Sequence, residues 1–150
     1  MDKKSRTLLN TAIGFLEGLH FRPEDIMVTG SIALDMQGLK PRNRFIHDVD
    51  LIIKMDEPTW RNLKLLEAIN LVDEVKDNMY PGRKDTIFFK FKDVTLNIWR
   101  NDMAEESNLK DSETGVYVAS ASHIIQAKKD YNREKDVRDI NAIIKQILDR

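Results

Sequence analysis

Residues 26–53 read IMVTGSIALDMQGLKPRNRFIHDVDLII. They contain two apolar runs with the length of short buried strands, and a glycine–serine pair follows the first of them. We predict a strand over 25–29 that stops at Gly30 and Ser31 and turns directly into a helix. The second run contains two aspartates, so charged side chains are placed inside an otherwise apolar strand.

These aspartates are the most informative pair in the sequence. In a strand over 45–54, Asp48 and Asp50 leave the same face, with Cα atoms roughly 6.5–7 Å apart, while Val49 and Leu51 point to the other face. Two carboxylates on one face repel each other, and a divalent cation removes that cost. Mg²⁺ takes oxygen ligands, usually one or two carboxylates with phosphates and water. The alternative is a pair of ordinary exposed aspartates at a strand end.

The glycine–serine pair has a chemical interpretation of its own. Gly30 lets the backbone approach an anion closely, and free N–H groups at a helix start can bind phosphate. The hydroxyl of Ser31 supplies another donor. Glycine–serine after a strand is also a common turn. A phosphate-binding turn and a carboxylate pair together indicate a site for a nucleoside triphosphate with Mg²⁺.

The rest of the chain predicts an α/β (α+β) protein with a small mixed β-sheet flanked by helices. The charged stretch KKDYNREKDVRD is expected to contain a loop that splits the last helical region in two. No repeat or linker suggests a boundary, so we expect one domain over 1–150. The other expected elements are helices over 5–19 and 32–37 (ended by Gly38), a helix from Pro58 with apolar Leu63, Leu65, Leu66 and Ile69, a hairpin of strands 86–91 and 94–99, and a helical region over 122–148.

Composition excludes several classes of protein. The 150 residues include 24 Lys+Arg, 25 Asp+Glu, three His and no Cys. Thiol catalysis, zinc ribbons and a disulfide framework are therefore excluded, and near-neutral charge argues against a protein that coats nucleic acid. No apolar run approaches the roughly 20 residues that span a bilayer, and no secretory signal is evident. We expect a cytoplasmic protein with no membrane partner.

Two segments carry a family resemblance. The first, TGSIALDMQG followed by RFIHDVDLII, resembles the signature of the DNA polymerase β-type nucleotidyltransferase superfamily, and it is most similar to the AbiEii-like and minimal nucleotidyltransferases. The second, AKKDYNREKDVRDI, resembles the helix–loop–helix of the same branch. The resemblance implies the nucleotidyltransferase fold. It also implies that Gly30 and Ser31 hold the triphosphate, that Asp48 and Asp50 coordinate Mg²⁺, and that Lys128 reaches the phosphates.

The sequence departs from this family at one position. The family's third carboxylate lies on a later strand, where this chain has Asn97 within LNIW. An amide oxygen can bind Mg²⁺, but it has no charge and cannot act as a general base. The substitution is expected to weaken catalysis more than nucleotide binding.

Three functions remain open at this point. The first is Mg²⁺-dependent transfer of a nucleoside monophosphate from an NTP to a hydroxyl of a protein, RNA or small molecule. The second is a catalytically degenerate binding protein that acts with a partner protein, either antitoxin-like in a toxin–antitoxin or phage-defence system, or as an accessory protein of a phage or mobile element. The third is a nucleotide sensor that binds NTP with Mg²⁺ without turnover.

Other residues have both structural and functional interpretations. Lys128 is either a phosphate ligand or a solvated lysine. Asp136 and Asp139 are expected to form ion pairs with Arg133 or Lys135 on a helix surface. Trp99 shares a strand face with Asn97 and either stacks on a base or only forms a wall of the site. The basic loop 40–44 is either a polyanion contact or a solvated loop.

Overall fold

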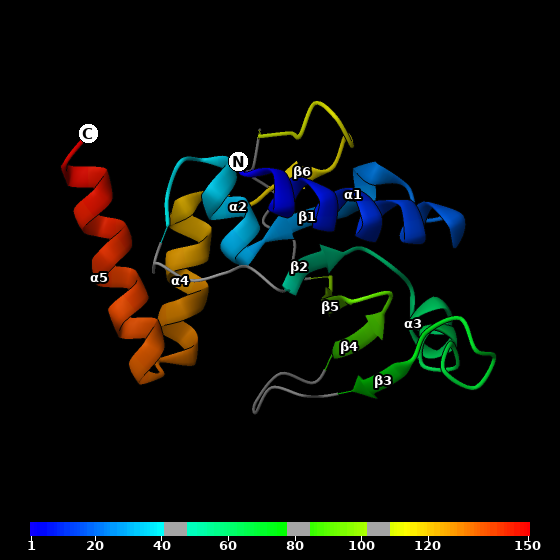
Figure 1. Cartoon of the computed structure of the whole chain (residues 1–150). Helices are drawn as coiled ribbons and strands as arrows, with labels where there is room; N and C mark the ends of the chain where they lie inside the picture. Colours follow the sequence, from blue (N-terminus) through cyan, green and yellow to red (C-terminus); the bar gives the residue numbers. More distant parts are fainter. Residues whose placement is uncertain (41–47, 78–84, 102–108) are drawn as a thin grey trace.

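A mixed β-sheet forms the centre of the computed structural model, which describes residues 1–40, 48–77, 85–101 and 109–150 (Figure 1). The strands are β1 (Ile26–Thr29), β2 (Asp48–Ile53), β3 (Glu74–Asp77), β4 (Thr86–Phe91), β5 (Val94–Arg100) and β6 (Tyr117–Val118). The helices are α1 (Lys3–Gly18), α2 (Gly30–Met36), α3 (Glu57–Leu63), α4 (Ala121–Tyr131), α5 (Glu134–Leu148) and a 3₁₀ turn at Pro23–Asp25. The predicted fold class, a mixed sheet with helices around it, is confirmed.

The strands lie in the order β3-β4-β5-β2-β1-β6. β2 runs parallel to β5 and β1 parallel to β6, whereas the β1–β2, β3–β4 and β4–β5 pairs are antiparallel. β2 therefore lies near the middle of the sheet, with hydrogen-bonded neighbours on both sides. A charged residue on such a strand is confined to whichever face the helices leave open.

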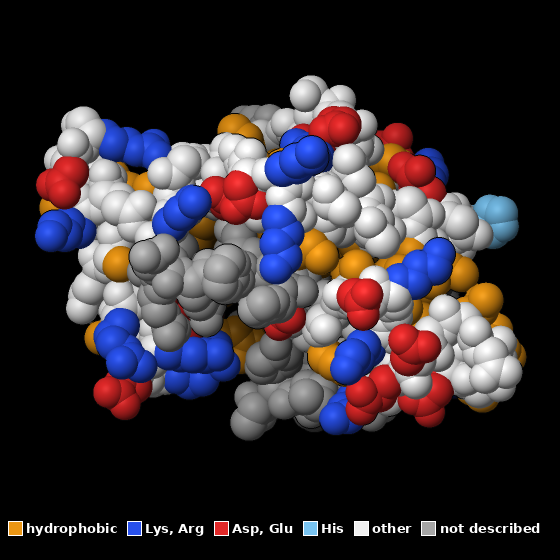
Figure 2. All heavy atoms as spheres, in the orientation of Figure 1, with side chains coloured by type: hydrophobic (Ala, Val, Ile, Leu, Met, Phe, Trp, Pro, Cys, Tyr) orange, Lys and Arg blue, Asp and Glu red, His pale blue; other side chains and the backbone are white. Residues whose placement is uncertain are grey.

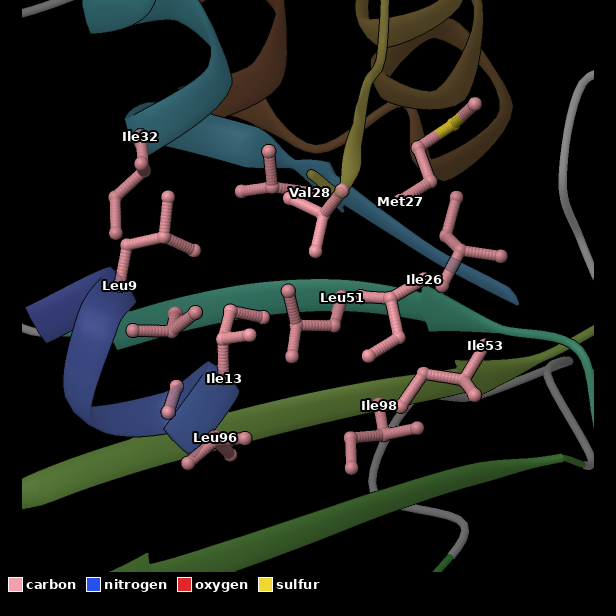
Figure 3. Packing of buried hydrophobic residues seen from close by; sticks show 14 of the residues in the cluster. Leu9, Ile13, Ile26, Met27, Val28, Ile32, Leu51, Ile53, Leu96 and Ile98 are labelled. Carbon is pink, nitrogen blue, oxygen red and sulfur yellow. The ribbon is translucent and has the colours of Figure 1, made fainter. Parts of the chain in front are cut away.

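One face of the sheet forms the hydrophobic core with α1. Leu51 and Leu96 are fully buried, and Figure 3 shows them beside Ile13 of α1. Asp2 caps the start of α1, because its carboxylate accepts a hydrogen bond from the backbone N–H of Ser5. The apolar residues of α1 recur at helical spacing. Because side chains alternate along a strand, the even-numbered residues of β2 point to the opposite face.

The β4–β5 hairpin confirms the predicted pair of strands. Its two-residue turn consists of Lys92 and Asp93, both with positive φ (45° and 64°), as in the turns that match the twist of a hairpin. The chain is also left-handed at Gly38 (φ 74°), one residue beyond the C-cap Gln37, which confirms that this glycine ends α2.

Several boundaries and two strands differ from the prediction. α2 begins at Gly30 itself rather than two residues later, and the 3₁₀ turn takes Asp25 out of β1. The predicted helix after Pro58 stops at Leu63, and Leu65 and Ile69 are 57% and 60% exposed in the turns that follow rather than on a buried stripe. β3 and β6 were not predicted, because these short strands at the two edges of the sheet carry little apolar alternation. Residues 45–47 of the expected second strand lie outside the described residues.

The last helical region is divided as expected. α4 ends at Asn132, which adopts the left-handed conformation (φ 49°), and α5 starts two residues later. In Figure 1 the two helices form a hairpin at one side of the molecule, with α5 on its outer side. Of the helices that the structure describes, none has the length and apolarity needed to cross a bilayer.

Candidate functional site

The predicted carboxylate pair lies on the sheet face opposite α1. In the β2–β5 register, Asp48 is paired with Thr95 and Asp50 with Asn97. We call this surface the polar face and define it by Thr29, Asp48, Asp50, Thr95 and Asn97. Asp48 is exposed, and Asp50 is half-buried between its neighbouring strands. The two-residue period therefore places both carboxylates where the pattern predicts.

Gly30 is in direct contact with the second carboxylate. β1 and β2 pair with Thr29 opposite Asp50, so the first residue of α2 lies beside that side chain. A Cβ placed on Gly30 would lie 2.2 Å from Oδ2 of Asp50 and 3.0 Å from its Cγ. Gly30 also has a φ of +65°, which L-residues rarely adopt. Glycine at this position is thus required both by the backbone and by the carboxylate.

Asn97 contacts the same carboxylate from the other side. Its Nδ2 donates a hydrogen bond of 2.9 Å to Oδ1 of Asp50, and its side chain is nearly fully buried. An aspartate at this position would place a second negative charge against Asp50. Asn97 therefore holds Asp50 in place through a charge-assisted hydrogen bond.

Two polar groups of the site have no partner among the described residues. The carboxylate of Asp48 makes neither a hydrogen bond nor an ion pair there, and the hydroxyl of Ser31 makes no hydrogen bond there. Ser31 is the second residue of α2 and is half-exposed. These groups can contact a ligand without first breaking a bond to the described part of the chain.

Lys128 lies in the α4–α5 hairpin, where it forms ion pairs. Its Nζ is 3.0 Å from Oδ2 of Asp139 and 3.9 Å from Oδ1 of Asp136. Both carboxylates are buried, at 1% and 0% exposure. The expected ion pairs are present, including the one between Arg133 and Asp136, but the carboxylates lie in the interior rather than on the helix surface. Burying a charge requires a paired partner, and the lysine supplies it from the neighbouring helix. Gly30, Asp50 and Asn97 are thus brought into contact, whereas Lys128 contacts a separate pair of carboxylates.

Asp136 has a second cationic partner in the residue before α5. Nε and Nη2 of Arg133 donate to its two carboxylate oxygens at 2.6 and 3.1 Å, and the Arg133 backbone N–H also donates to it. Burial acts to raise the pKa of Asp136, but the hydrogen bonds from Arg133 and the charge of Lys128 outweigh it, and the pKa lies below its ordinary value. The pair stabilises the first turn of α5, where a negative charge is favourable.

An aromatic pair connects the sheet to this hairpin. Nε1 of Trp99 donates a hydrogen bond of 3.0 Å to the hydroxyl of Tyr131, and the guanidinium of Arg133 lies 5.0 Å from the centre of the Tyr131 ring. Trp99 is two register pairs beyond Asn97 and therefore lies on the same side of β5. Tyr131 was not singled out in the sequence, because nothing local indicates that the end of α4 reaches this strand.

The described residues contain no cluster of three or more His, Cys, Asp or Glu side chains suited to a metal. The side-chain oxygen ligands that the polar face offers are two carboxylates, one amide and the hydroxyls of Thr29 and Thr95. This set fits Mg²⁺ shared with phosphate oxygens and water, and does not fit a cage made by protein alone. Residues 41–44 of the basic loop, and His47, lie outside the described residues.

Comparisons with known proteins leave the activity open. No protein-family model matches the chain, and no curated protein matches it. Among solved structures, the chain is similar to JHP933 from Helicobacter pylori, with 18% sequence identity and a TM-score of 0.48. The match covers 93% of this chain and 66% of JHP933, so the chain spans just under two thirds of that protein's length. A similarity of this size does not identify an activity.

Proposed function

We propose that this chain is a nucleotidyltransferase of the polymerase β type, which binds an NTP with Mg²⁺ at the polar face and transfers its nucleoside monophosphate to a hydroxyl acceptor. The observation that carries the proposal is the contact between Gly30 and Asp50. Two residues that are 20 positions apart in the sequence, the glycine of a turn suited to phosphate and a carboxylate suited to a metal, lie in contact. Such chemistry needs positioning and neutralisation of phosphate charge more than covalent participation by the protein.

Asp48 and Asp50 would hold the metal. The resemblance of the sequence to the family suggests this role, and the shared face of β2 and the lack of a described partner for Asp48 support it. When bound, Mg²⁺ supplies charge neutralisation at the phosphates and polarises the phosphoryl oxygens. Asn97 would act as a positioning residue, because its amide fixes one carboxylate oxygen of Asp50.

Gly30 and Ser31 would contact the triphosphate, with the Ser31 hydroxyl as a donor. In the reaction, the acceptor oxygen forms a bond to the α-phosphorus, the α–β bridging bond breaks, pyrophosphate leaves and the hydroxyl proton passes to water. Asn97 cannot take that proton, because an amide is not a base at neutral pH. The acceptor would be a protein, an RNA or a small molecule.

One observation favours a second function, that of a catalytically degenerate binding protein. The third acidic position is an amide that donates to Asp50, and the described residues supply no other carboxylate in a cluster with this pair. Nucleotide binding without transfer would use the same Asp48 and Asp50. Such a chain would act through a partner, as in an antitoxin-like or phage accessory protein.

Calorimetric titration with ATP, GTP, CTP and UTP tests the proposal without knowledge of the acceptor. We expect at least one NTP to bind in the presence of Mg²⁺ and to lose affinity at least tenfold in Asp50→Asn. Asp93→Asn is the matched control, because it removes the same charge from an exposed turn and should leave binding unchanged. If no NTP binds with Mg²⁺, or if Asp50→Asn binds as the native chain does, the site is not a nucleotide site.

Transfer is tested separately from binding. An NTP labelled on the α-phosphate is incubated with the protein and with candidate acceptors, and covalent label is measured. Label that appears in a macromolecule or a new small product, and that requires Mg²⁺ and Asp50, supports transfer. Mg²⁺-dependent binding without label in any acceptor supports the degenerate protein instead.

A further inference from the structure

α5 has an unusual distribution of charged and apolar side chains. Its inner side buries Asp136 and Asp139 against α4, together with Ile143. Its outer side carries four large aliphatic residues that are 40–77% exposed: Val137, Ile144, Ile147 and Leu148. Ion pairs thus occupy the contact that apolar residues usually make, and several aliphatic side chains remain in contact with solvent.

These exposed residues follow one line along the helix. With half-buried Ile140 they form what we call the α5 stripe, defined as Val137, Ile140, Ile144, Ile147 and Leu148. The first four are spaced three, four and three residues apart, which is the spacing that packs one helix against another. Scattered exposed aliphatic residues need no explanation, but an aligned set on one helix indicates a contact surface.

The polar row beside the stripe carries mainly positive charge. Glu134, Arg138, Asn141 and Lys145 follow one another at four, three and four residues on the exposed side of the helix. Arg138 and Lys145 make no ion pair with any described residue. Figure 2 shows further Lys and Arg side chains where α4 and α5 meet. A partner that packs on the stripe would therefore gain from negative charge along its edge.

The same charges argue against a second copy of this chain. In an antiparallel pair of α5 helices registered on the stripe, Val137 of one copy faces Ile147 of the other. Arg138 then comes level with Lys145 of the other copy, on the same side of the pair. In a parallel pair, Arg138 is level with its own counterpart but lies on the opposite side of the pair. The antiparallel arrangement therefore places like charges together, which disfavours self-association in that orientation.

We propose that the α5 stripe is a docking surface for one amphipathic helix of another protein, with aliphatic residues toward the stripe and acidic residues beside Arg138 and Lys145. α5 has 15 residues, so it is about 22 Å long and matches a partner helix of about four turns. This contact is independent of the nucleotide site, and neither Asp48 nor Asp50 takes part in it.

The probe is a fluorescein-labelled synthetic helical peptide with leucines spaced three and four residues apart and glutamates on both flanks. The control peptide has the same leucines, with lysines in place of the glutamates. Anisotropy should show that the full-length protein binds the glutamate peptide at least tenfold more tightly than the lysine peptide. Ile144→Glu and Ile147→Glu should each weaken binding at least tenfold. Ile69→Glu makes the same change at an exposed site after α3 and should have no effect.

Charge reversal tests the specificity. The double variant Arg138→Glu, Lys145→Glu should prefer the lysine peptide while its thermal unfolding stays within a few degrees of the native chain. The proposal is overturned if neither peptide binds, or if both bind equally. It is also overturned if sedimentation shows that the protein self-associates through residues that Ile144→Glu disrupts, or if vesicles containing phosphatidylserine adsorb the protein and compete for the same residues.

Discussion

Replacement of Gly30 by alanine tests whether the glycine–serine turn and the carboxylate pair form one site. The alanine methyl would lie 2.2 Å from Oδ2 of Asp50, whereas ordinary contacts exceed about 3.4 Å. The carboxylate must therefore move by about 1 Å or more. Because Asn97 holds its other oxygen at 2.9 Å, this movement strains or breaks that hydrogen bond.

Two costs add up in this variant. An L-residue in the left-handed region costs about 1–2 kcal/mol. Loss of a hydrogen bond to a charged group adds about 1.5–3 kcal/mol. We therefore expect Gly30→Ala to lower the free energy of unfolding by about 2.5–5 kcal/mol. For a chain of this length, that corresponds to a decrease in Tm of about 5–20 °C.

Gly38→Ala is a matched control at the other end of α2. Gly38 also has a positive φ (74°), but a methyl there would meet only Nη2 of Arg150, at 3.0 Å, which is the end of a flexible side chain. We expect this variant to lose only about 1–2 kcal/mol of unfolding free energy, because only its backbone conformation is unfavourable for alanine. Thermal and urea unfolding measure both variants, and NTP titration should show impaired binding only in Gly30→Ala.

A double-mutant cycle identifies the contact responsible. In an Asp50→Ala background the oxygen and the Cγ that the methyl meets are gone and only the Cβ remains, at 3.1 Å, so the cost of Gly30→Ala should fall toward that of Gly38→Ala. The reasoning is refuted if Gly30→Ala is no more destabilising than Gly38→Ala in the native background. It is equally refuted if the cost of Gly30→Ala is the same with and without the Asp50 carboxylate.

Three further variants test the surrounding interactions. Asn97→Asp should lose about 1–3 kcal/mol of stability without Mg²⁺, because it places two carboxylates together, and should regain that stability when Mg²⁺ is added. If Mg²⁺ does not change the stability of this variant, no metal binds at Asp50. Lys128→Met removes the cation that lies 3.0 Å from buried Asp139 and should destabilise by about 3–5 kcal/mol in urea unfolding. Weaker NTP binding at unchanged stability would instead indicate that Lys128 is a phosphate ligand. Hydrogen bonds from Arg6 lower the pKa of Asp111 from 3.8 to about 2, so its ionised form contributes about 2 kcal/mol that is present above pH 4 and disappears as the pH falls to 2. Asp111→Asn should accordingly be less stable than the native chain at pH 7 and equal to it near pH 2, and a constant difference would show that the carboxylate is not the cause.

The local features of this protein follow from its sequence. The two-residue period of a strand places Asp48 and Asp50 on one face, whatever the strand packs against. The β4–β5 hairpin and the end of α2 were predicted for similar reasons, since turn residues and hydrophobic alternation act over a few positions. Each of these features depends on neighbours that are close in the chain.

The contacts that Asp50 makes with Asn97 and Gly30 depend on tertiary structure alone. Asn97 reaches Asp50 only because β5 lies parallel to β2, and Gly30 reaches it only because β1 lies on the other side. Nothing near Lys128 in the sequence indicates that its partner is a buried aspartate on the next helix, nor that α5 turns its aliphatic residues outward. Strand order and helix rotation depend on the free energy of packing the whole core and of forming the buried charge pairs. Local sequence patterns carry no information about that total free energy.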